Sequence, residues 1–298
     1  MAINFAELKK NRASSMDRLN EALSKINTKK SYKDDTYWTL SVDDDGVGQA
    51  IIRFLDTPEG EEFPFVRYID YGFKGPGGWY INKSRVTIND KDPVAELNSK
   101  LWRMSEDDKS PQRMQARRQG RRINYVSNIL IVKDPAHPEN NGKVFRYKYG
   151  QKIFEKLNAL AYPEFEGEPS INPFDLWTGA NFKLRRKIGS NKIPTYDDSK
   201  FEDPSPIASN DEEIKEIYEK CHSLNAVIAP DQFKSYEELE TQLRRVLGDD
   251  IMEDAGPTLR SESSSKQKAA SSKWEDDELS SDDEVMNSFK SLVDGIDD

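Results

Sequence analysis

The chain alternates between short apolar runs and polar turns over most of residues 37–188. Runs rich in β-branched and aromatic residues are typical of β-strands, and the Gly, Pro and Asp residues between them are typical of turns. Several short strands joined by turns favour a barrel or a sandwich over strands that alternate with crossover helices. The predicted strands are 37–42, 49–55, 63–73, 79–81, 125–132, 144–149 and 177–188.

Elsewhere apolar residues recur at spacings of three, four and seven, and this period predicts helices. Asp92 followed by Pro93 is a typical helix start. Together the two patterns predict an α+β protein that is mainly β. Cys221 falls on an apolar helix face, so we predict a buried thiol rather than a reactive one. The predicted helices are 1–27, 93–104, 152–160 and two within 211–247.

The net charge of −10 is unevenly placed along the chain. Residues 249–298 hold 15 acidic and 5 basic side chains, whereas residues 1–248 hold 39 of each sign. Residues 261–273 have the composition of a disordered linker, and residues 274–298 combine acids with a thin apolar stripe. Such a tail predicts a motif that folds on a partner. Because the rest of the chain is neutral, the overall acidity does not exclude nucleic-acid binding.

Several classes of protein have little support in this sequence. Cys221 is the single cysteine, and with His137 and His222 alone beside it no disulfide or usual Cys/His zinc set can form. No apolar run is long enough for a membrane span, so we expect a cytoplasmic protein. Neither histidine has a recognisable partner, and the acids at 43–45 and 197–198 are in turn-like settings. We therefore predict no enzyme activity and no cofactor.

Basic residues concentrate in two stretches that contain no acid. Residues 109–133 form the first stretch, and residues 176–196 form the second. Clustered arginine neutralises phosphates without regard to base sequence. A solvated face is the ordinary alternative, but the lack of a nearby acid favours a phosphate-binding one. The basic candidates in these stretches are Arg113, Arg117, Arg118, Arg121, Arg122, Lys183, Arg185 and Arg186.

The predicted strand 144–149 alternates cations with aromatic rings. Arg146 and Lys148 share one face, and Phe145, Tyr147 and Tyr149 share the other. A single-stranded polynucleotide needs both groups, because cations neutralise its phosphates and flat rings stack on its bases. For Phe145 we favour core packing, whereas Tyr147 and Tyr149 suit either the core or base contact.

Several of these stretches resemble the single-stranded DNA-binding, or helix-destabilising, proteins of T-even-type phages. The run NILIVKDP at 128–135 is the most specific, and GQAIIRFL at 48–55 is also similar. The resemblance covers most of residues 37–200, and the two termini match in character rather than in letters. The other matching stretches are 72–74, 79–81, 138–140, 142–145 and 179–182.

The resemblance implies an OB-fold barrel core with added helices and a basic, aromatic cleft that binds single strands. It implies base contacts for Trp79, Tyr125, Tyr147 and Tyr196, to which the strand pattern adds Tyr149. It places the phosphate contacts at Arg121, Arg122, Arg146 and Lys148.

The resemblance also implies three regions. Residues 1–28 would be a helical, basic arm for cooperative self-association along DNA, and 29–248 would be the DNA-binding core. Residues 249–298 would be a linker and a disordered acidic tail that contacts phage replication and recombination proteins in the cytoplasm of the infected bacterium. The arm's self-association candidates are Lys9, Lys10, Arg12, Ser14 and Ser15.

One departure from the family concerns a metal. The well-known members hold a structural zinc with one His and three Cys, but the matching positions here are Tyr71, Ser84, Asp92 and Ala95. We therefore expect a zinc-less subdomain over 71–108. Packing of Trp102, Leu97, Val94 and Ile88 around Tyr71 would stabilise it instead.

The leading hypothesis is a non-enzymatic protein that binds single-stranded DNA cooperatively and without sequence preference during phage replication, recombination and repair. An RNA-binding translational regulator is an alternative, because stacking and phosphate contacts do not exclude RNA. A third hypothesis is an interaction hub that acts mainly through its acidic tail.

Overall fold

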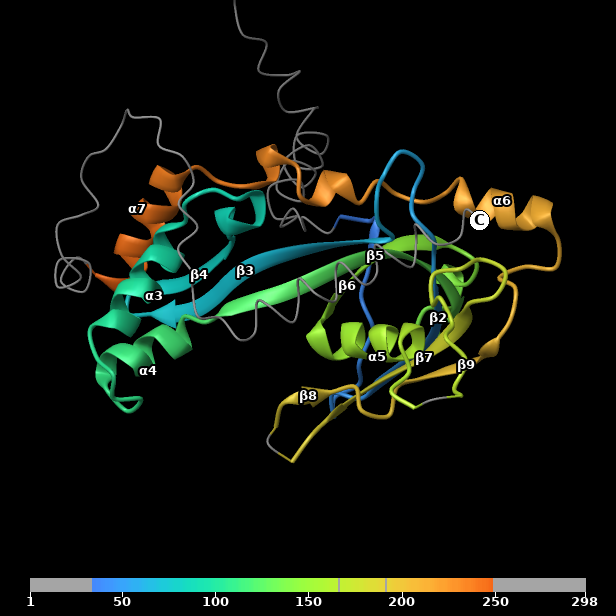
Figure 1. The fold of residues 1–298 in the computed structure, drawn as a ribbon, viewed down its shortest axis with the longest axis horizontal. Helices are drawn as coiled ribbons and strands as arrows, with labels where there is room; N and C mark the ends of the chain where they lie inside the picture. The colour runs from blue at the N-terminus through green and yellow to red at the C-terminus, as the bar shows by residue number, and fades with distance from the viewer. Residues whose placement is uncertain (1–33, 166, 191, 249–298) are drawn as a thin grey trace, which may run out of the picture. The chain divides into compact units, whose positions relative to one another are not determined.

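The computed structural model describes residues 34–248, apart from 166 and 191. The chain divides into two compact units, Met1–Tyr37 and Trp38–Asp298, and nearly all of the described residues belong to the second. Nine strands form one sheet (Figure 1). They are β1 (Tyr37–Trp38), β2 (Gly48–Phe54), β3 (Phe65–Gly75), β4 (Gly78–Lys83), β5 (Arg121–Lys133), β6 (Val144–Gly150), β7 (Ala180–Ile188), β8 (Pro194–Thr195) and β9 (Lys200–Pro204).

Helices interrupt the strands in chain order. Helices α3 and α4 separate β4 from β5, α5 follows β6, and α6 and α7 come after the last strand. The α-helices are α3 (Pro93–Arg103), α4 (Pro111–Arg118), α5 (Gln151–Ala161), α6 (Asp211–Tyr218) and α7 (Tyr236–Leu247). The short 3₁₀ helices are η1 (Arg85–Ile88), η2 (Pro138–Asn140), η3 (Asn225–Val227) and η4 (Pro230–Gln232).

The long strand β5 is central to the sheet. Its first half, Arg121 to Ser127, pairs antiparallel with β3, and its second half pairs antiparallel with β2. β6 pairs antiparallel with β5 from Asn124 to Leu130. On the far side of β2, β7 pairs with β2, β8 and β9, whereas β4 pairs with β3 alone among the described strands. β5 therefore connects the β3–β4 hairpin to the rest of the sheet.

The first apolar core lies between α5 and the sheet. Tyr125 stacks on Phe154 with ring centroids 4.0 Å apart, and Trp38 packs edge-on against Tyr147 at 5.4 Å. Burial of each such ring removes roughly 150–250 Å² from water, so these contacts dominate the packing. Other buried members of this core are Ile52, Phe54, Phe65, Ile129, Ile153, Leu157, Phe174, Phe182 and Leu184.

A second core joins the β3–β4 hairpin to α3, α4 and α7. Tyr80 stacks on Phe73 with ring centroids 5.0 Å apart, and both rings are buried against the helices. The hairpin turn approaches the end of α7 so closely that a Cβ at Gly77 would overlap the carbonyl oxygen of Arg245. The helix-borne members of this core are Val94, Leu97, Leu101, Ala116, Leu239, Leu243, Val246 and Leu247.

Each helix of the second core begins with a polar cap. Asp92 accepts hydrogen bonds from the backbone of α3, and Ser235 and Glu238 form a capping box at the start of α7. Ser110 caps α4 in the same way, with Pro111 at the first helical position. Caps of this kind satisfy backbone N–H groups that have no partner within the helix.

The prediction of an α+β protein that is mainly β is confirmed. The strand predicted over 177–188 begins at Ala180, and neither α4 nor β9 was predicted. The helix predicted over 1–27 lies outside the described residues. No helix in the described part of the chain combines the length and hydropathy needed to cross a bilayer.

Two predictions about packing need correction. Val94 and Leu97 do pack with Tyr71, but Trp102 is 39% exposed and Ile88 lies outside this core. Outside this core, the guanidinium groups of two arginines of α4 lie over the Trp102 ring. Cys221 is half-buried against a smaller third core rather than fully buried.

Candidate nucleic-acid interface

One face of the sheet gathers cations from four strands. The strand register pairs Asp70 with both Lys83 and Arg122, and it pairs Val126 with Lys148. Because directly paired residues point to the same side of a sheet, alternate residues of β3, β4, β5 and β6 form a common surface. We call this surface the cationic face. It consists of Tyr68, Asp70, Gly72, Lys74, Trp79, Ile81, Lys83, Arg122, Arg146 and Lys148.

The centre of the cationic face is the ring of Tyr68, which is only 6% exposed. The Nζ atoms of Lys83 and Lys148 each lie 5.2 Å from the centroid of that ring. Asp70 accepts hydrogen bonds from Arg122 Nε at 2.7 Å and from Lys148 Nζ at 3.2 Å. One carboxylate thus lies among several cations, and the local charge stays positive.

The cations at this centre influence one another's ionisation. Burial, Lys148 and Arg146 together lower the pKa of Lys83. Burial alone would lower the pKa of Lys148, but Tyr68 and Asp70 raise it above the ordinary value of lysine. Lys148 therefore stays charged at neutral pH, and like-charge repulsion favours the arrival of an anion.

The loop between α6 and α7 borders the cationic face. Lys83 Nζ donates a hydrogen bond to the carbonyl oxygen of Val227 at 2.6 Å. Asn128 Nδ2, on the same side of β5, donates to the carbonyl oxygen of His222 at 2.8 Å. In Figure 1 this segment runs from α6 to α7 alongside the long strands.

The β4 end of the cationic face is apolar and exposed. Trp79 is 60% exposed and Ile81 is 62% exposed, although both are large hydrophobic residues. The register places them opposite Lys74 and Gly72, and a Cβ at Gly72 would overlap the guanidinium of Arg122. An exposed indole on the same face as a guanidinium provides a stacking surface together with a phosphate-binding group.

The tyrosines of β5 and β6 lie on the opposite face. Tyr125, Tyr147 and Tyr149 are 1%, 5% and 3% exposed and belong to the core beneath α5. Tyr149 shares a hydrogen bond with the hydroxyl of Ser127, and Tyr125 donates one to Gln151. A base could reach these rings only if the core opened, so we leave them out of the proposed interface. The alternation expected for strand 144–149 is confirmed, with Arg146 and Lys148 on the outer side.

The arginines of α4 form a separate cluster with one acid. The guanidinium groups of Arg113 and Arg117 lie 4.7 and 5.4 Å from the Trp102 ring centroid, and both pair with Asp108 at 2.9 and 2.8 Å. Arg118 donates to the carbonyl oxygen of Met114. The compensating acid stands directly before the acid-free stretch, which is why the sequence reading overlooked it.

Arg121 is also separate from the cationic face. It stands opposite Tyr71 in the register and therefore lies on the side of the sheet that carries the second core.

The second basic stretch lies on β7 and pairs with local acids. Lys183 Nζ is 2.8 Å from Glu202, and Arg185 is 4.0 Å from Asp198. Arg186 donates to the carbonyl oxygen of Gly46. Tyr196, which follows β8, is half-buried at the edge of the first core. These residues are not part of the cationic face. The arm residues Lys9, Lys10, Arg12, Ser14 and Ser15 lie outside the described residues.

Sequence reasoning missed Tyr68, Asp70 and Lys83. None of them belongs to a basic stretch, and each is placed beside Lys148 only by the strand register. The local patterns of β3 and β4 predict strands but cannot show which strands lie next to them.

The zinc that the family resemblance implies does not fit the residues at the matching positions. Ser84 Oγ donates to Asp92 Oδ2 at 3.0 Å, and Asp92 Oδ1 accepts from the backbone of Val94 and Ala95. Burial, and then the charge of Asp92, raise the pKa of Tyr71, so its hydroxyl stays protonated. Ala95 offers no ligand atom, and no three His, Cys, Asp or Glu side chains among the described residues form a metal-binding group. Absence of zinc stays a prediction.

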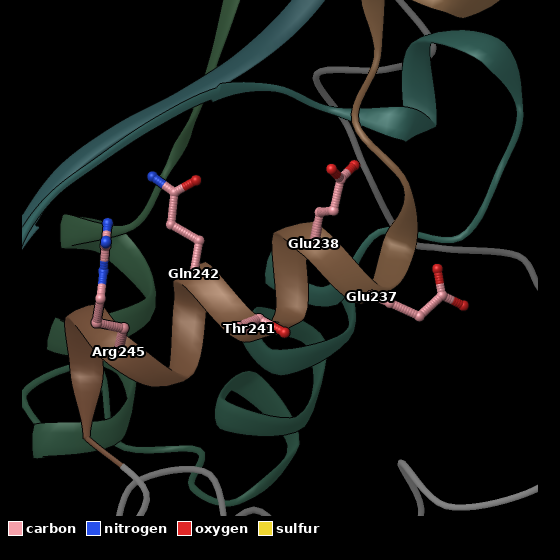
Figure 2. A pocket seen from close by; sticks show the side chains of 5 residues that line it. All are labelled: Glu237, Glu238, Thr241, Gln242 and Arg245. Carbon is pink, nitrogen blue, oxygen red and sulfur yellow. The ribbon is translucent and has the colours of Figure 1, made fainter.

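A shallow hollow of about 380 Å³ lies along α7. Figure 2 shows Glu238, Gln242 and Arg245 on one side of the helix, while Glu237 points away from them. Gln242 is already bonded to Asn82, and Glu238 is part of the helix cap. The hollow therefore lacks the converging polar groups of a ligand site.

A cationic sheet face with an exposed tryptophan is typical of proteins that bind nucleic acids. The comparison with known families agrees. A family described as "gp32 DNA binding protein like" matches residues 46–247, so the chain belongs to this family of DNA-binding proteins.

Individual relatives match over most of the chain. The single-stranded DNA-binding protein of Enterobacteria phage T4 is 39% identical over 243 residues, which cover 79% of this chain and 79% of that protein. The single-stranded DNA-binding protein of Enterobacteria phage T2 is 40% identical over 233 residues, which cover 76% of this chain and 75% of that protein.

Proposed function

We propose that this protein binds single-stranded DNA through its cationic face. The main support is the convergence of Lys83, Arg122, Arg146 and Lys148 on a sheet surface that ends in the exposed ring of Trp79. Membership of a DNA-binding family and relatives named for single-stranded DNA support the choice of ligand.

The chemistry of this face suits a single strand better than a duplex. Phosphates are neutralised by Arg122, Arg146 and Lys148, while a base stacks on Trp79. A duplex keeps its bases stacked on one another, so the indole has no base to contact. Stacking and charge carry no base-specific hydrogen bonds, so we expect little sequence preference.

Membership of the family supports a proposal for the wider architecture. We assign an OB-fold to the core at 29–248, a self-association arm to 1–28 and a partner-binding tail to 249–298. Tyr196 and the β7 residues Lys183, Arg185 and Arg186 would extend the DNA path only if phosphates displaced Glu202 from Lys183 and Asp198 from Arg185. The protein would act without catalysis in the infected bacterium, with replication and recombination proteins as partners.

Equilibrium binding at several salt concentrations tests the proposal. The ligands are an oligonucleotide of about eight thymidines, a duplex of equal length and the matching RNA, since OB-folds bind roughly 4–16 nucleotides. We expect preference for the single DNA strand and a log–log salt slope of about −2 to −3, because each neutralised phosphate contributes about 0.7. Equal affinity for the duplex would contradict the proposal, and stronger RNA binding would favour the regulator hypothesis.

A further inference from the structure

We infer that Asp70 is an internal counterion of the cationic face, which a DNA phosphate displaces from Arg122 and Lys148. This inference rests on the proposed function. Among the described positions of β3 to β6 that form the face, Asp70 is the single acid. Its carboxylate bonds both cations, one through each oxygen.

The depths of the three side chains support displacement. The Asp70 side chain is 10% exposed, whereas those of Arg122 and Lys148 are 50% and 45% exposed. The cations therefore extend outward from a carboxylate that lies beneath them. A phosphate that approaches from solvent meets the two cations before it meets the acid.

The two ion pairs are weak enough to be exchanged. Both cations are about half exposed, and water screens pairs at such positions strongly. Arg122 has further N–H donors beyond Nε, and the ammonium of Lys148 has three. Each cation can therefore turn toward a phosphate without leaving the surface.

The charge of Asp70 limits affinity under this inference. In the free protein it neutralises one of the cations, so the face presents one positive charge less to DNA. Removal of that charge should tighten binding and increase the number of counterions released. If Asp70 instead held the two cations in the orientation that DNA needs, removal of the acid would weaken binding.

The test uses the full-length protein and the short thymidine oligonucleotide. D70N retains an oxygen that accepts a hydrogen bond from Arg122 but removes the charge. We expect its affinity to rise several-fold at low salt and its salt slope to become more negative by about 0.7, the contribution of one phosphate on a single strand. D70E, which restores the charge, should return the slope to the wild-type value. If D70N does not fold, D70S replaces it, since serine also offers an acceptor.

D108N is the matched control. It makes the same change in net charge and also releases two arginines, but these lie on α4 rather than on the cationic face. We expect its slope to remain that of the wild type. Unchanged or weaker binding by D70N would overturn the inference, and so would an equal gain in D108N. If the wild-type protein itself shows no preference for single strands, the proposed function fails instead.

Discussion

At the residue scale, Trp79 carries the clearest expectation. Its indole is 60% exposed on an edge strand and contributes little to the core, so its position suggests a role in binding. W79A should weaken single-strand binding by about 1–3 kcal/mol, or roughly 5- to 150-fold, the value of one stacked base. The melting temperature should stay unchanged. Fluorescence anisotropy with the short thymidine oligonucleotide measures the effect.

Trp177 provides the control for this substitution. It is 52% exposed, and its Nε1 bonds Asp211 at the start of α6, away from the cationic face. W177A should bind DNA as the wild type does. Equal losses in the two variants would refute a specific contact with Trp79.

Cys221 shows how burial controls reactivity. Burial and the neighbouring Asp56 raise the pKa of its thiol to about 12, so very little thiolate exists at pH 8. Alkylation by iodoacetamide should therefore be at least about a hundredfold slower in the folded protein than in denaturant. Rapid labelling of the native protein would show that the thiol is accessible and ionised.

At the element scale, hydrogen bonds from a buried carboxylate stabilise the start of α3. Asp92 is 1% exposed, and its carboxylate accepts hydrogen bonds from the Ser84 hydroxyl and from the backbone of the first turn of the helix. D92A should lower the free energy of unfolding by about 2–4 kcal/mol, because it removes a cap and leaves buried donors without a partner. S110A, which removes the simpler cap of α4, should cost about 1 kcal/mol. Urea unfolding compares the two variants.

From the residues at the start of α3, we predict that neither stability nor DNA binding depends on zinc. Since Tyr71, Ser84, Asp92 and Ala95 do not form a ligand set, a chelator should change neither the unfolding midpoint nor single-strand binding. Elemental analysis of the purified protein gives a direct measurement. A stoichiometric zinc content, or a midpoint lowered by the chelator, would contradict this expectation.

The elements themselves were largely predictable from the sequence. The uninterrupted apolar run of β5 predicts a strand that is buried on both faces. The alternation along β6 predicts a strand that is buried on one face. Helix α4 escaped prediction because its residues are mostly polar and show no apolar period, and its cap at Ser110 was the only strong signal. The site was harder, because strand register decides which side chains meet. Lys83 reaches Lys148 across β3 and β5, a relation that no local pattern contains.

At the scale of the whole molecule, the net charge is unevenly distributed, because residues 1–248 are neutral and the tail is acidic. Residues 249–298 carry the entire net charge of −10. If the tail competes with DNA for the cationic face, its deletion should strengthen single-strand binding, most of all at low salt. Binding curves for residues 1–248 and for the full chain provide the comparison. Loss of binding on deletion would favour the hypothesis of a hub that acts through its tail.

For the N-terminal arm, residues 1–28, we expect a role in cooperative binding. Deletion of residues 1–20 should lower cooperativity on long single strands while binding to the short oligonucleotide stays largely intact. A titration on both lengths separates the two quantities. Equal losses on both would refute a role of the arm in self-association.

The most direct test of the central claim compares two pairs of cations. R122Q/K148Q neutralises the centre of the cationic face but retains donors to Asp70, whereas R113Q/R117Q neutralises the cluster on α4. We predict that the first variant binds the thymidine oligonucleotide more weakly, with a salt slope less steep by about 1.4 for two lost phosphates. The second variant should match the wild type. Loss of binding in the second variant alone, or equal losses in both, would contradict the assignment of the interface.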